Sequence, residues 1–139
     1  MRKIFGFAGL IGVFVACATD PVADVSGTWT WQESLSTQSG LSCEATGELL
    51  IAQFADNNRF TGQRSRTGTC TGAPAGFTID GGQAIIGAEV VGMDVTFEID
   101  FCEYEGTLTT NNAMSGTVLC PDGVGPVQEA IEGTWSASR

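Results

Sequence analysis

The chain has 139 residues with sixteen acidic and six basic side chains, no histidine, nineteen glycines and four prolines. This length suits one domain, the net charge of −10 excludes nucleic acid as a partner, and the lack of histidine excludes Ser-His and Cys-His nucleophile pairs. We therefore expect no enzymatic activity and no cofactor, and the composition favours short strands with many turns.

The chain opens with a segment that has the plan of an export signal. Arg2 and Lys3 precede the apolar run IFGFAGLIGVFVA, residues 4–16. A basic start followed by a short apolar run is typical of a secretory signal peptide, and thirteen residues are too few to span a bilayer comfortably. The alternative is a buried N-terminal strand or helix, which would need an amphipathic pattern that this run lacks.

Cys17 ends this run in the sequence FVAC, which resembles the lipobox of bacterial lipoproteins. The resemblance implies a signal peptide over 1–16, a lipid on Cys17 that anchors the protein in the cell envelope, and a tether over 17–25. The residue after the cysteine is Ala18 and not the Asp that favours inner-membrane retention, so we expect the outer membrane. Phe14 departs from the usual leucine, and the alternative is ordinary cleavage nearby with Cys17 left as a free thiol.

From residue 26 onward, extended segments alternate with turn residues. In DVTFEIDF the apolar residues Val95, Phe97, Ile99 and Phe101 alternate with polar ones, which indicates an antiparallel sheet with one side on a core. No capped helix is evident, so we predict one all-β domain over 26–139. The expected strands cover residues 26–33, 43–54, 59–70, 84–91, 94–101, 103–109, 113–120 and 131–138.

Two hairpins can be assigned a register. With the first turn centred on Asn111, the facing pairs are Cys102–Cys120, Tyr104–Val118, Gly106–Gly116 and Leu108–Met114. A slip by one residue would bring together side chains from opposite faces. In the second hairpin a turn over 55–58 brings Cys43 opposite Cys70, whereas a shifted register pairs Glu48 with Arg66, so we expect one β-bulge.

The four cysteines after Cys17 allow three pairings. An even number in an exported chain suggests two disulfides, and the hairpin registers favour Cys43–Cys70 and Cys102–Cys120. The spacing of these cysteines matches no zinc motif, and we expect no metal site.

The domain begins with GTW, which resembles the Gly-x-Trp motif of the lipocalin-like, or calycin, barrels through Gly27 and Trp29. This resemblance implies a single antiparallel up-and-down barrel of about eight strands, closed by pairing of the first and last strands. It also implies that a small apolar ligand binds in the interior. We expect the inward-facing residues to carry no charge, and Gly106 and Gly116, which face each other, to leave room for the ligand. The candidate ligand-binding residues are Trp29, Trp31, Phe97, Ile99, Tyr104, Leu108, Met114 and Trp135.

Two other functions stay open. One is a protein-binding module similar to barrel-shaped periplasmic protease inhibitors, acting through loops such as TGAPAG, residues 71–76. The other is a structural envelope lipoprotein with a filled core, in which the tryptophans only close the barrel. An internal cavity would favour the ligand carrier, and a packed interior with an exposed apolar patch would favour the protein-binding module.

The remaining charged residues form two groups. Acidic residues between 94 and 105 could offer oxygen ligands to Ca²⁺, but alternate residues of a strand diverge, so we interpret them as a solvated face. Arg59, Arg64 and Arg66 could bind an acidic partner, but we expect them to offset Glu44 and Glu48 on the neighbouring strand.

Overall fold

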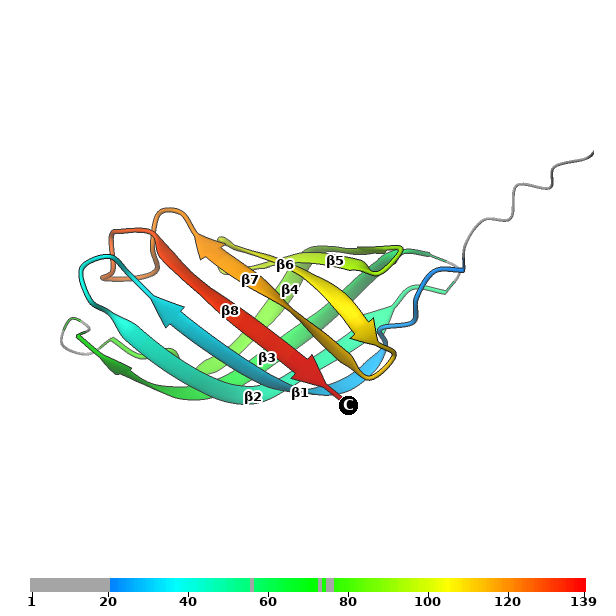
Figure 1. The fold of residues 1–139 in the computed structure, drawn as a ribbon, viewed down its shortest axis with the longest axis horizontal. Coiled ribbons are helices and arrows are strands. Elements are labelled where there is room, and N and C mark those ends of the chain that lie inside the picture. The colour runs from blue at the N-terminus through cyan, green and yellow to red at the C-terminus, as the bar shows by residue number, and fades with distance from the viewer. Residues whose placement is uncertain (1–20, 56, 73, 75–76) are drawn as a thin grey trace, which may run out of the picture.

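The computed structural model describes residues 21–139 except 56, 73 and 75–76, and it shows one closed antiparallel barrel in which each strand pairs with the next (Figure 1). The predictions for 1–16 and for Cys17 lie outside the described residues. This part of the chain contains no helix long and apolar enough to cross a membrane. The strands are β1 (Gly27–Ser36), β2 (Ser42–Gln53), β3 (Arg59–Thr71), β4 (Gly81–Val91), β5 (Asp94–Ile99), β6 (Cys102–Thr110), β7 (Ala113–Cys120) and β8 (Ile131–Ser138).

The strands follow from the period-two pattern, because buried and exposed residues alternate along them. In β5, for example, Val95, Phe97 and Ile99 are buried and the residues between them are exposed. The expected strand over 94–101 is wrong at its end. Asp100 and Phe101 form a two-residue turn in which both have positive φ, 50° and 66°. The backbone twist of such a turn matches the right-handed twist of the two strands that it joins in a tight hairpin. Phe101 therefore does not face inward as predicted; its side chain is 91% exposed.

Both predicted disulfides are confirmed, Cys43–Cys70 and Cys102–Cys120. The register of the second half is also confirmed, with Tyr104 opposite Val118 and Leu108 opposite Met114. The bulge expected between β2 and β3 is wrong, because the pairing that places Cys43 opposite Cys70 continues unshifted to Gln53 and Phe60. The register shifts occur instead between β3 and β4, between β4 and β5, and within the β6–β7 pair.

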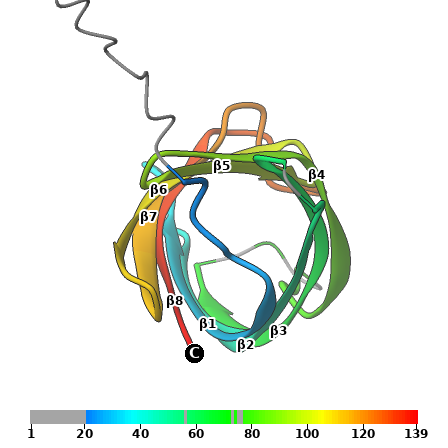
Figure 2. The same ribbon diagram turned by 90° about the vertical axis from the view of Figure 1, so that its right-hand side faces the viewer.

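The barrel closes where β1 pairs with β8. At the end where the described chain begins, residues 21–26 cross the opening (Figure 2). Val25 is fully buried there and accepts a hydrogen bond from Trp29 Nε1 at 2.9 Å. The Arg139 guanidinium lies 4.4 Å from the centre of the Trp29 ring and also donates to the backbone carbonyl of Asp24. The N-terminal segment is thus fastened to the last residue of the chain.

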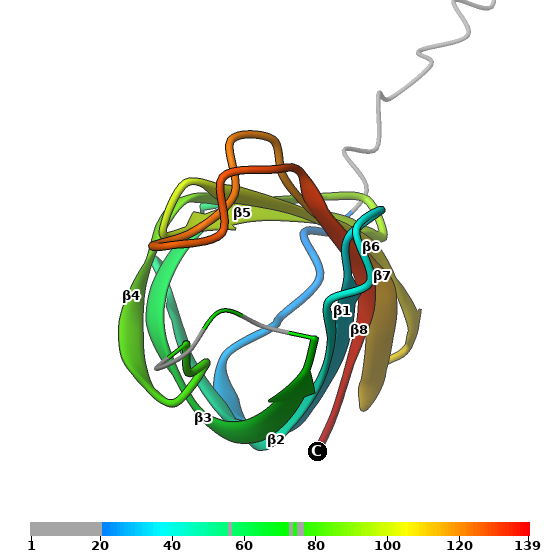
Figure 3. The ribbon, with the colours of Figure 1, turned by 90° about the vertical axis from the view of Figure 1, so that its left-hand side faces the viewer.

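The opposite end holds both disulfides and the connections β1–β2, β3–β4, β5–β6 and β7–β8. Figure 3 shows this end of the barrel, and Ile79, in the described part of the β3–β4 connection, is buried in the core. Val127 in the β7–β8 connection is also buried. Both openings of the barrel are therefore covered by segments of the chain itself.

Candidate functional site

The middle of the barrel is filled by aromatic rings. Trp31 stacks on Trp135 with ring centres 5.1 Å apart, and Phe97 stacks on Tyr104 at 4.9 Å. Phe97 also meets the edge of Trp135 at 5.4 Å. All eight residues predicted to bind a ligand are buried, so the structure brings them together as one core; their role in binding stays a prediction.

Gly106 and Gly116 face each other as predicted, but the room that they leave is taken. A Cβ atom on Gly106 would lie 2.5 Å from Cζ2 of Trp135. The indole ring of Trp135 thus occupies the space over Gly106, and its Nε1 donates to the carbonyl of Thr117 at 3.0 Å. The expectation of free space at these glycines is wrong because a large side chain from β8 fills it.

Four hollows of about 300 to 620 Å³ lie on the outer surface of the described barrel. They are bordered mainly by polar residues of the outer face, such as Gln32, Glu44 and Thr67. Of the predicted ligand set, only Trp135 borders one of these four hollows. They are grooves between outward side chains and differ from the interior cavity that the ligand prediction needs.

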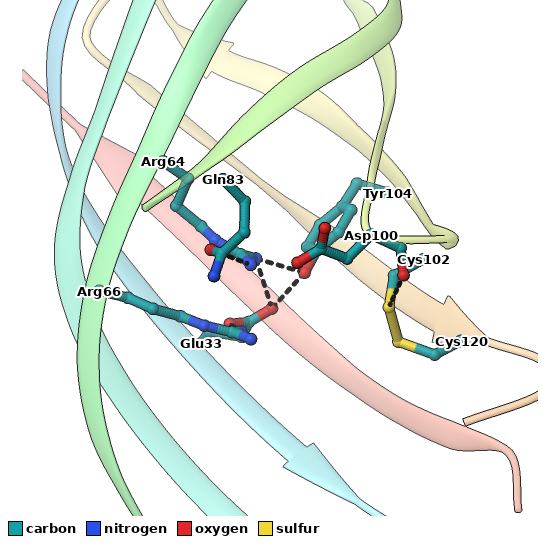
Figure 4. The surroundings of a disulfide bond; sticks show 8 residues. All are labelled: Glu33, Arg64, Arg66, Gln83, Asp100, Cys102, Tyr104 and Cys120. Carbon is teal, nitrogen blue, oxygen red and sulfur yellow. Dashed lines mark hydrogen bonds and ion pairs between the residues drawn. A yellow bond between two sulfur atoms is a disulfide. The ribbon is translucent and has the colours of Figure 1, made fainter. Parts of the chain in front are cut away.

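A polar layer lies inside the barrel (Figure 4), and its Arg64 lies over the rings of Trp31 and Tyr104. Its members come from four strands and are Glu33 of β1, Arg64 and Arg66 of β3, Gln83 of β4 and Tyr104 of β6. The side chains of Glu33 and Arg64 are almost fully buried, and that of Arg66 is 10% exposed. The expectation that the interior set contains no charge is therefore wrong.

Glu33 is the acceptor at the centre of this polar layer. The Tyr104 hydroxyl donates to its Oε1 at 2.6 Å, Arg64 Nη1 lies 3.4 Å from the same oxygen, and Arg66 Nη1 donates to Oε2. Arg64 Nη1 also donates to the Tyr104 hydroxyl, and Arg64 Nη2 donates to Oε1 of Gln83 at 3.1 Å. The layer is one connected network that joins strands far apart in the sequence.

Arg64 and Arg66 enter the interior because of strand parity. β3 places them on the same face as Phe60, which is buried, and Cys70, whose disulfide partner Cys43 is buried. The expected pairing of all three arginines with Glu44 and Glu48 on the outer face is therefore wrong for Arg64 and Arg66, which bind Glu33. Arg59 has the opposite parity and is exposed.

The polar layer has more hydrogen-bond donors than acceptors. Two guanidinium groups share one carboxylate, and Glu33 is the only acid that forms an ion pair with them among the described residues. Within this part of the chain, the buried N–H groups of Arg64 Nε and Trp31 Nε1 have no acceptor. Buried donors without partners and surplus buried charge are both unfavourable, so the layer is suited to receive a further acceptor.

The network also changes the acidity of Tyr104. Burial, and next the negative charge of Glu33, raise the pKa of the Tyr104 hydroxyl well above its usual value, although Arg64 acts in the opposite direction. Tyr104 is therefore a neutral donor to Glu33 throughout the physiological pH range. It is the only tyrosine in the chain.

The acidic residues between 94 and 105 lie on the outer face. Asp94, Glu98, Glu103 and Glu105 are all exposed, and Glu98 is directly opposite Glu103. Among the described residues, no group of three or more acids, histidines or cysteines is placed to hold a metal ion. This arrangement is that of a solvated strand face.

The comparisons with known proteins give only distant likenesses. No family model and no curated protein matches the sequence. Two solved structures resemble the barrel: the S-type phycobiliprotein lyase CPES from Guillardia theta, at 11% identity over 81% of this chain and 86% of that chain with a TM-score of 0.48, and EF1p2_mFAP2b bound to DFHBI, at 14% identity over 82% and 92% with a TM-score of 0.45. The strand order and its closure by themselves show an eight-stranded antiparallel up-and-down barrel.

Proposed function

We propose that the chain is an exported, lipid-anchored protein of the bacterial cell envelope, in the outer membrane, whose barrel binds a small, mainly apolar ligand in its interior. It acts by binding and not by catalysis. The observation that carries the proposal is the polar layer, in which the unpartnered donors of Arg64 and Trp31 lie beside an aromatic core. A site of this composition, apolar with a few polar groups, is typical of small-molecule pockets.

Because the aromatic layer is packed, a ligand has to enter by moving side chains apart. The polar layer is the part of the interior best able to adapt, since arginine side chains have several rotatable bonds and lose more rotamer freedom than aromatic rings when fixed. A ligand would therefore lie between the aromatic rings and the end of the barrel that Ile79 covers.

The proposed lipid anchor is supported by two features of the barrel end that lies nearest to Cys17 in the chain. Only three residues lie between Cys17 and Pro21, the first described residue, so an extended tether of four residue steps reaches at most about 14 Å. At this end several apolar side chains are about half exposed, namely those of Val22, Phe54, Val91 and Met93. This end would face the bilayer, and the end with the disulfides would face away from it.

Two measurements test the proposal. Mass spectrometry of protein made in a Gram-negative host is expected to show a diacylglyceryl group on Cys17; a water-soluble product with a free Cys17 thiol would refute the anchor. For the ligand, the protein is titrated with fatty acids, retinoids and an apolar dye while tryptophan emission and thermal stability are followed. If no compound has an effect at tens of micromolar, or about −6 kcal/mol, the ligand-carrier function is wrong.

A second candidate function, the protein-binding module, is favoured by the packed aromatic interior together with the exposed Phe101. This aromatic side chain is 91% exposed at the tip of the β5–β6 turn, in a backbone conformation that is uncommon for a large residue. Aromatic side chains of this kind often anchor protein interfaces. Inhibition of a panel of envelope proteases by the wild-type protein, and its loss in Phe101→Ser, would support this function over the carrier.

A further inference from the structure

Counted over the described residues, the interior of the barrel carries one more positive charge than negative. Arg64 and Arg66 bring two guanidinium groups, and Glu33 brings the only carboxylate that is paired with them among the described residues. Arg64 is 1% exposed, and its surroundings on two sides are the rings of Trp31 and Tyr104, 5.5 to 5.7 Å from its central carbon. Water therefore screens this surplus charge poorly.

The two unpartnered donors lie in the same region. Trp31 Nε1 and Arg64 Nε are both buried without an acceptor in the described part of the chain, and the Arg64 guanidinium lies over the Trp31 ring. Every other N–H-bearing nitrogen of the Arg64 guanidinium is engaged, Nη1 by Glu33 and Tyr104 and Nη2 by Gln83. What the layer lacks is one negative charge with acceptors for two N–H groups.

We infer that the interior ligand is an amphipathic monocarboxylic acid whose carboxylate binds at Arg64, Arg66 and Trp31. This inference rests on the proposed ligand-binding function and specifies the chemistry of that same site. A carboxylate has two oxygens, it matches the planar guanidinium group, and its single charge cancels the surplus. The apolar body of the acid then lies against the aromatic rings of the core.

A phosphate monoester fits this site less well. It carries about −1.5 to −2 charges at neutral pH, so it would leave uncompensated negative charge beside Glu33 in a buried environment. An alcohol of the same length offers no charge and leaves the surplus in place. The three headgroups should therefore bind the barrel with different affinities, because only the carboxylate cancels the single surplus positive charge of the polar layer.

The test compares three ligands with the same tail: decanoic acid, decan-1-ol and decyl phosphate. Binding to the purified full chain is measured by calorimetry and by tryptophan emission. We expect the acid to bind at least about tenfold more tightly than the alcohol, which is about 1.4 kcal/mol, and more tightly than the phosphate. Equal affinity of acid and alcohol would overturn the inference and leave the carrier function standing, whereas no binding of any of the three would overturn both.

Variants of the charged residues make the test specific. Arg66→Gln leaves Glu33 and Arg64 as a balanced pair, so the preference for the acid over the alcohol is expected to disappear. Arg59→Gln is the matched control, because it removes the same charge from the exposed face of the same strand, and the preference is expected to persist.

Glu33→Gln provides a second reading that does not depend on Arg66→Gln being folded. It raises the interior surplus to two positive charges, so decyl phosphate should gain at least about tenfold in affinity relative to decanoic acid. A purely structural role of the polar layer predicts no change in the ratio of the two affinities. An unchanged ratio in Glu33→Gln, or a full preference for the acid in Arg66→Gln, would show that the inference is wrong.

Discussion

Raising the pH above 10 should destabilise this protein through Tyr104 alone. The chain has one tyrosine and no histidine, its only lysine is Lys3 in the predicted signal peptide, and four of its five cysteines form disulfides. In the unfolded chain Tyr104 ionises near pH 10. In the folded protein its pKa is raised, because the hydroxyl is buried and donates to Glu33 at 2.6 Å.

The sign of the effect follows from proton binding. Below pH 10 Tyr104 is protonated in both states, so its contribution to stability is fully present and constant. Above pH 10 the unfolded chain releases a proton that the folded protein keeps, so the free energy of unfolding falls by about 1.4 kcal/mol per pH unit until Tyr104 ionises in the folded state. Between pH 10 and pH 12 the loss is about 2.3 kcal/mol, a substantial part of the 5–15 kcal/mol typical of a domain.

The assay is urea unfolding at a series of pH values, with the phenolate absorbance band followed in parallel. The band should stay absent in the folded protein well above pH 10 and appear together with unfolding. In Tyr104→Phe the free energy of unfolding should be lower by about 1–3 kcal/mol at neutral pH, because Glu33 and Arg64 lose a partner, and should no longer fall above pH 10. A reversible phenolate band with a midpoint near pH 10 in the folded protein would refute the burial of Tyr104 and its contact with Glu33.

Three further predictions concern packing and cross-links. Gly116→Ala should lower the free energy of unfolding in urea by about 1–3 kcal/mol or more, because its Cβ would lie 1.8 Å from a backbone oxygen. Gly82→Ala should change stability little, because the one close neighbour of its Cβ is the end of a flexible glutamine at 3.0 Å; equal effects of the two variants would contradict the packing. Arg139→Ala should lower the free energy of unfolding by about 1 kcal/mol, because it removes a contact with a buried tryptophan. Arg59→Ala should change it by no more than about 0.5 kcal/mol, and thermal unfolding of both variants measures the difference. Each disulfide closes a loop of 18 or 27 residues and should contribute about 3–4 kcal/mol, measured by unfolding with and without reductant; a non-reducing peptide map that joins the two hairpins would contradict the pairing.

Most of the barrel could be predicted from the sequence because its determinants are local. The alternation along residues 94–99 defines a strand, and the turn at Asn111 defines the register of the hairpin around it. Both signals lie within short stretches of sequence, and the register brings the cysteines together. The end of β5 was harder to predict, because Phe101 continues the apolar alternation. Only the pairing of Ile99 with Cys102 leaves two residues for a turn and forces Phe101 outward.

The polar layer was missed for a different reason. Charged residues usually lie outside, so residue type alone predicts that the arginines of β3 pair with Glu44 and Glu48 on the neighbouring strand. Strand parity would have found the layer, since Glu33 shares a face with Trp31 and Arg64 shares a face with Phe60. That Glu33 meets Tyr104 could not be predicted locally, because 71 residues separate them and they meet only once the sheet is closed.

The seam between β1 and β8 sets the order in which this barrel can be completed. Thr30 is paired with Ser138, more than a hundred residues further along the chain, and a ribosome makes β8 after every other strand. Until β8 is available, the growing sheet has two open edges and no enclosed interior, and pairing of such distant strands is slow, in the range of milliseconds to seconds. This delay suits the proposed export, in which the chain would cross the membrane extended, because the strand that closes the barrel into a rigid cylinder is made last.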